Sequence, residues 1–187
     1  MTNGCFGVGY AMSNPSAEFM SQGPRTILAY VKQQLSGAGP DVTMNWHGLA
    51  ESAAFRARDD AEVVTWLEIA IQTYDWLAST DSEPDHSSFM ASGMLARVNR
   101  LRWCPGTAAE DVARRAEILN WFHRSKPFTV SEAKASAEKW RELSAPDIRA
   151  LRRLKNKLNI VGLIFSGCNI QPDAEMAEWL ALRPQLP

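Results

Sequence analysis

Apolar side chains recur every three or four residues along most of the chain, which is the spacing of amphipathic helices. In the first half this pattern predicts helices over 24–35, 63–77 and 89–101. Asp59 and Asp60 precede the second of these, where the helix dipole favours acidic side chains. The sequence therefore predicts a mainly α protein.

The pattern continues in the second half. Thr107 and Glu110 form the signature of a capping box, which predicts a helix running through His123. Polar and helix-breaking residues over 79–88 predict a loop, and 169–172 predicts a turn. A short tail helix is expected from Ala174 to Leu182.

Residues 127–167 combine short apolar runs, which are typical of strands, with the three-or-four-residue spacing of helices. The sequence predicts a short strand at 128–130, a supporting helix from Lys134 to Leu143, a second helix from Ser144 to Leu158, and an apolar strand at 161–164. Ser144 is a favourable N-cap for the second helix. This stretch has the most distinctive organisation in the chain.

The order of these elements resembles a winged helix-turn-helix over about residues 108–167, with Ile118, Leu119 and Phe122 as the stripe of its first helix. It is similar to the modules of phage and plasmid replication and regulatory proteins, which belong to mobile elements. The resemblance implies a helical bundle with a C-terminal winged-helix-like unit, at most a small β-ribbon, and a second helix that enters the major groove of DNA.

The second helix is strongly basic on one face, and Asp147 is its only acid. Arg149 and Arg152 are expected to reach base edges, and the remaining cations to meet phosphates. A solvated basic face on an ordinary helix is the alternative interpretation. The predicted nucleic-acid-binding residues are Arg149, Arg152, Arg153, Lys155 and Lys157, with Lys134 on the supporting helix.

Charge divides unevenly along the chain. Residues 1–98 hold 5 Lys/Arg against 11 Asp/Glu, whereas residues 99–187 hold 15 against 10. Together with the breakers at Cys104–Thr107, this predicts an acidic helical region over 1–104 and a basic region over 105–187. The acidic region is expected to engage a protein partner or to self-associate, although two halves that attract each other in one fold would show the same split.

Other features narrow the class of protein. No apolar run is long enough for a membrane span and the N-terminus lacks the order of a signal peptide, so we expect a cytoplasmic protein with no membrane contact. The 3 cysteines are widely spaced, which argues against a disulfide framework and a zinc site. Residues 1–15 predict an irregular arm, with a short strand possible there, and 42–46 a strand or a connector.

Signals for an enzyme are weak. Cys104 and His123 are the available nucleophile and base, but their spacing says nothing of proximity. The acids at 59–62 are typical of helix capping and those at 81–86 of a solvated loop, and metal binding is the alternative interpretation of each cluster. We therefore predict no catalytic residues, metal or cofactor.

The expected function is that of a non-enzymatic DNA-binding protein, a regulatory or replication accessory factor that places a basic helix in the major groove of duplex DNA. The alternative is a helical protein–protein interaction factor, an inhibitor or adaptor that binds no nucleic acid.

Overall fold

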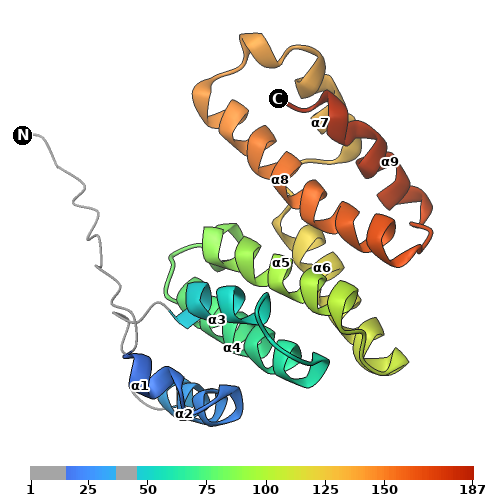
Figure 1. Ribbon diagram of the computed structural model, residues 1–187. Helices are drawn as coiled ribbons and strands as arrows, with labels where there is room; N and C mark the ends of the chain where they lie inside the picture. The colour runs from blue at the N-terminus through green and yellow to red at the C-terminus, as the bar shows by residue number, and fades with distance from the viewer. Residues whose placement is uncertain (1–15, 37–45) are drawn as a thin grey trace, which may run out of the picture. The chain divides into compact units, whose positions relative to one another are not determined.

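The computed structural model describes residues 16–36 and 46–187, and every regular element in them is helical (Figure 1). This confirms the mainly α fold class. The predicted arm at 1–15 and most of the run at 42–46 lie outside the described residues. The α-helices are α1 (Ala17–Met20), α2 (Pro24–Ser36), α3 (Trp46–Ala54), α4 (Asp60–Ser79), α5 (Ser88–Trp103), α6 (Ala108–Ser125), α7 (Val130–Glu138), α8 (Ala145–Cys168) and α9 (Ala174–Leu182). Short 3-10 turns are η1 (Pro84–His86), η2 (Trp140–Glu142) and η3 (Arg183–Gln185).

The chain forms two compact units, Met1–Trp76 and Leu77–Pro187, which divide within α4. The boundary predicted at Cys104–Thr107 lies inside the second unit instead. The physical reason is that α5 packs against both α6 and α8, so it belongs with the elements that follow it.

The first unit contains α1 to α3 and most of α4. The ring of Phe19 meets Tyr30 at a centroid distance of 5.0 Å and Trp46 at 5.4 Å, which joins α1, α2 and α3 through aromatic contacts. The Tyr74 hydroxyl donates to a Glu51 carboxylate oxygen at 2.9 Å, which links α4 to α3. Ile27, Val31, Ala50 and Ala54 are buried in this unit.

The core of the second unit forms around α8. Leu151, Leu154 and Leu158 are fully buried on α8, and their cluster includes Trp121 of α6 and Trp179 of α9. Burial of such large apolar side chains is the main source of stability in a helical unit. Figure 1 shows α8 and α9 side by side at the C-terminal end of the chain.

The apolar strand predicted at 161–164 is wrong, because α8 continues as a helix to Cys168. Val161 and Ile164 are buried and extend the apolar stripe of α8 at helical spacing. A Cβ on Gly162 would lie 2.6 Å from Nη1 of Arg183 in η3, so the glycine leaves room for that guanidinium beside α8. The helix ends at Asn169, whose φ of 51° is left-handed.

The strand predicted at 128–130 is also wrong. Thr129 is the N-cap of α7, and its hydroxyl and the Glu132 carboxylate form a capping box. The supporting helix is correspondingly earlier and shorter than predicted, because α7 ends at Glu138 and the chain then turns through η2. Trp140 begins that turn, Leu143 follows it, and both pack against the core.

Several predicted element ends are confirmed. Thr107 and Glu110 make a capping box at the start of α6, and the Ser144 side chain accepts from the Asp147 backbone N–H at the start of α8. The tail helix α9 spans the predicted residues Ala174–Leu182. No helix in the described residues has both the length and the apolar character needed to cross a bilayer.

Candidate nucleic-acid interface

The N-terminal half of α8 presents basic side chains at an exposed helix end. Ser144 caps the helix and residues 145–147 are exposed, with Pro at the first turn. Arg149, Arg152 and Arg153 follow and are all exposed. Residues at positions i, i+3 and i+4 share one side of a helix, so the three guanidinium groups form one feature, called here the arginine ridge.

The arginine ridge has no carboxylate counterpart within its unit. Across residues 77–187, all of which are described, none of the three arginines lies in an ion pair, whereas other cations do. The paired cations are Arg97 with Glu117, Arg124 with Asp85, and Lys126 with Glu175. The ridge guanidinium groups therefore keep their donors available to an external anion.

Lys155, which the sequence grouped with these arginines, is half-buried, and its Nζ donates to the backbone oxygen of Leu186 at 2.7 Å. That bond ties α8 to the C-terminal end of the chain beyond η3. A phosphate contact by Lys155 would have to displace it.

Lys157 lies in the interior, not on the exposed face where the sequence placed it. The residue is only 6% exposed, and its Nζ donates to the backbone oxygen of Ser125 at 2.9 Å. Burial lowers the pKa of Lys157 to about 8, Arg153 adds to this effect, and Asp85 opposes it. The physical reason for burial is that η1 and the end of α6 cover this position, which no local sequence pattern reveals.

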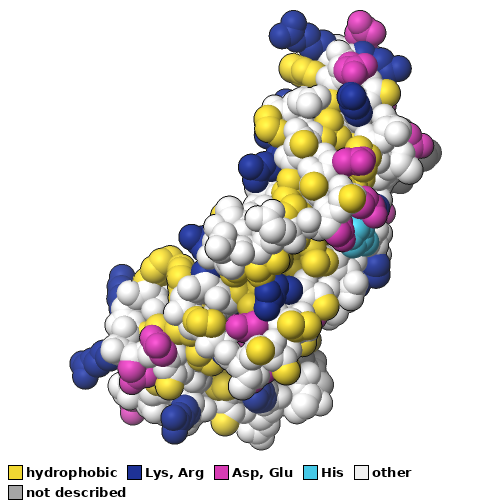
Figure 2. Space-filling view, turned by 90° about the vertical axis from the view of Figure 1, so that its right-hand side faces the viewer, with side chains coloured by type: hydrophobic (Ala, Val, Ile, Leu, Met, Phe, Trp, Pro, Cys, Tyr) yellow, Lys and Arg dark blue, Asp and Glu magenta, His cyan; other side chains and the backbone are white. Residues whose placement is uncertain are grey.

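Lys134, the remaining predicted residue, is exposed on α7 and lines an open pocket of about 360 Å³. Glu178 of α9 lines the same pocket, so its negative charge opposes the positive electrostatic potential of Lys134. Figure 2 shows one face of the molecule, and on its upper part Lys and Arg side chains alternate with Asp and Glu. Lys134 therefore adds less to an anionic interface than the arginine ridge does.

Two of the acids that could have been metal ligands, Asp59 and Asp85, make structural contacts instead. Asp59 accepts from the Glu62 backbone N–H at 2.9 Å, which caps α4, and Asp85 lies 2.9 Å from Arg124, which lowers the pKa of the Asp85 carboxyl. The described residues contain no group of three His, Cys, Asp or Glu side chains that could share a metal ion.

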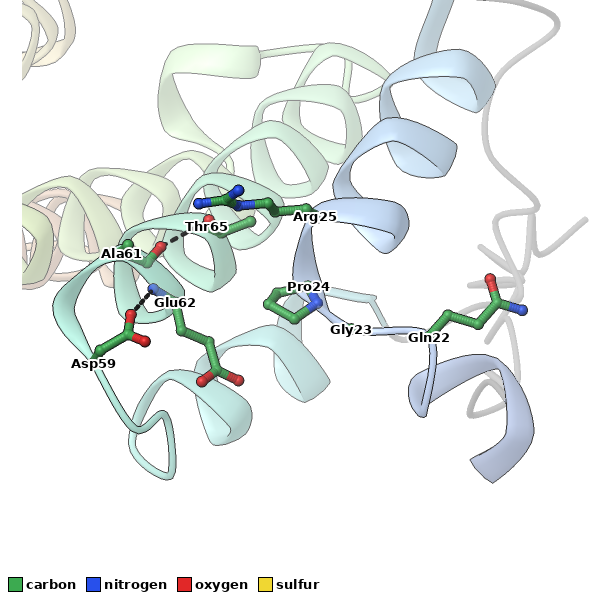
Figure 3. A pocket seen from close by; sticks show the side chains of 8 residues that line it. All are labelled: Gln22, Gly23, Pro24, Arg25, Asp59, Ala61, Glu62 and Thr65. Carbon is green, nitrogen blue, oxygen red and sulfur yellow. Dashed lines mark hydrogen bonds between the residues drawn. The ribbon is translucent and has the colours of Figure 1, made fainter.

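Asp59 and Glu62 also line a pocket of about 440 Å³ in the first unit (Figure 3). Arg25 lines it from α2, and Thr65 uses its hydroxyl to donate to the Ala61 backbone oxygen at 2.8 Å. Acidic and basic groups are mixed, and much of their hydrogen-bonding capacity serves the helix itself. The lining of this pocket therefore indicates no particular ligand or reaction.

The candidate nucleophile and base differ in exposure. Cys104 is buried at the end of α5, whereas His123 is exposed on α6, with its Nδ1 4.0 Å from a Glu175 oxygen and 3.2 Å from the Lys126 amine.

Comparison with known proteins found no match to a family model, a curated protein or a solved structure.

Proposed function

We propose that the protein binds duplex DNA through the arginine ridge, with the N-terminal half of α8 lying in the major groove. The observation that carries this proposal is the exposure of Arg149, Arg152 and Arg153 on two successive turns, without an ion pair in the described second unit. Neutralising backbone phosphates by such cations supplies most of the affinity in sequence-independent DNA binding.

The position of the ridge on α8 supports this mode. Helix-turn-helix proteins place the N-terminal residues of their second helix against base edges, and the positive end of the helix dipole adds to the attraction for phosphate. Arg149 and Arg152 are nearer the N-terminus of α8, so we assign them to base edges. Arg153 is assigned to phosphate.

The proposal does not use a wing, because residues 161–164 are helical. It also does not use Lys157, whose amine is buried. It retains the order of a shorter helix, α7, a turn and a longer basic helix, α8. The acidic first unit is proposed to bind a protein partner or to self-associate.

The test is fluorescence anisotropy with a labelled random-sequence duplex at low salt. Changing Arg149, Arg152 and Arg153 together to Ala should weaken binding by about tenfold or more, because up to three charge-assisted contacts are lost. The control removes three exposed cations of the first unit, Lys32, Arg56 and Arg58, and should bind nearly as well as the unchanged protein.

Equal weakening in both triple variants would show that only total charge matters and would contradict DNA binding through the arginine ridge. No binding of the unchanged protein at low salt would remove the DNA proposal altogether. The protein–protein interaction factor, an inhibitor or adaptor, would then be the leading hypothesis.

A further inference from the structure

A small, partly open cavity lies in the second unit, between α8, the C-terminal end of α6 and the η1 turn. Its volume is about 120 Å³. Four of its lining residues, Ala150, Arg153, Leu154 and Lys157, lie on α8, and the others are Glu83, His86, Ser125 and Pro127. The cavity thus joins one arginine of the ridge to the buried amine of Lys157.

The Lys157 ammonium has hydrogen-bonding capacity left for a ligand. Its contact with the Ser125 backbone oxygen is short, at 2.9 Å. The contacts with the Asp85 backbone oxygen and with His86 Nδ1 measure 3.4 and 3.5 Å, at the outer limit of hydrogen bonding. An ammonium group carries three donors, so a better acceptor could replace either long contact.

The charges around the cavity are unbalanced. Arg153 and Lys157 line it together, and the charge of Asp85, which is not among the lining residues, favours the Lys157 ammonium while the smaller effect of Arg153 opposes it. Glu83 is the one acidic residue in the lining, and like Arg153 it is exposed to water. An anion inside the cavity would attract both cations and relieve their repulsion.

We propose that this cavity binds a single tetrahedral oxyanion, namely phosphate or the terminal group of a phosphomonoester. Lys157 and Arg153 donate to its oxygens, and His86 lies at its side. The volume of about 120 Å³ is small, in keeping with one compact ion. Pockets for organic ligands of drug size are larger, about 300 Å³ or more.

The cavity shares Arg153 with the proposed duplex interface, but phosphate binding can be measured separately. A phosphate ion needs no major groove and no second arginine of the ridge. A neighbouring pair of residues makes the two separable. Arg152 and Arg153 are adjacent and both exposed, but only Arg153 lines the cavity. Substituting Gln removes the same charge from either position and leaves a side chain of related shape.

The experiment is calorimetric titration of inorganic phosphate into the full chain, without nucleic acid and with ionic strength held constant by chloride. Arg153→Gln should weaken phosphate binding by about tenfold, whereas Arg152→Gln should change it by less than about twofold. Glu83→Gln should strengthen binding, because it removes the opposing charge. Lys157→Met should abolish binding, and circular dichroism checks that this variant folds.

A parallel titration with a nucleoside monophosphate identifies the source of the group. Tighter binding than that of inorganic phosphate assigns the site to a phosphomonoester, and equal or weaker binding assigns it to the free ion. Two results would overturn the proposal: no saturable binding of either ligand at about 20 mM, or equal weakening by Arg152→Gln and Arg153→Gln. Phosphate binding by a chain that binds no duplex would overturn only the proposed function.

Discussion

Lys157 and Arg153 lie four positions apart on α8 and share one side of the helix, yet Arg153 is exposed and Lys157 is 6% exposed. The difference comes from the neighbours of Lys157. The Ser125 backbone oxygen, which accepts from its amine, belongs to the last residue of α6, where the dipole favours a cation. The amine also lies 5.4 Å from the centre of the Trp121 ring. These contacts offset part of the cost of burying the charge.

The pKa of Lys157 predicts how stability depends on pH. Its pKa is about 8 in the folded chain and about 10.5 in an unfolded one, so between these values the unfolded chain binds more protons. Stability should therefore rise with pH across this window, by roughly 3 kcal/mol from this group alone. Below about pH 8 both states are protonated, and the contribution to the slope vanishes.

Urea denaturation of the unchanged protein and of Lys157→Met, from pH 7 to pH 10, measures this contribution. The unchanged protein should gain stability relative to the Met variant as pH rises. Lys155→Met is the control, because it removes a neighbouring amine of α8 that is only half-buried. A constant difference between the unchanged protein and Lys157→Met would contradict burial of a charged amine.

Helix starts were more predictable than helix ends. Hydroxyl caps at Thr107 and Ser144 act over three residues, so the local sequence contains the whole interaction. The same signal is present at Thr129 and Glu132, but the β-branched residues Thr129 and Val130 also favour a strand. At 161–164 a short apolar run fits a strand as well as a buried helix, and only packing against α9 decides between them.

The cap of α7 can be tested directly. Thr129→Ala should lower the free energy of unfolding by about 1 kcal/mol, because the Glu132 backbone N–H loses its acceptor. Ser131→Ala on the same turn is the control, since Ser131 is exposed, and its effect should stay within about 0.5 kcal/mol. Equal urea midpoints for the two variants would mean that Thr129 does not cap the helix.

Charge over the whole chain gives little guidance to function. Residues 1–76 hold 4 Lys/Arg against 8 Asp/Glu, and residues 77–187 hold 16 against 13, so the second unit is only slightly basic. What distinguishes it is arrangement, because several of its cations are paired with carboxylates and those of the arginine ridge are not. The helical spacing of the three arginines is visible in the sequence, so their shared side of α8 could be predicted. The boundary within α4 depends on long-range packing that no composition shift marks.

The dependence of duplex affinity on salt tests the central proposal most directly. The logarithm of the binding constant falls with the logarithm of salt concentration by about 0.9 for each phosphate neutralised. Because Arg153 is the ridge residue assigned to phosphate, removing Arg149, Arg152 and Arg153 should make the slope shallower by about 1, whereas removing Lys32, Arg56 and Arg58 should leave it unchanged. Identical slopes for the unchanged protein and the ridge variant would show that these arginines do not meet the DNA backbone.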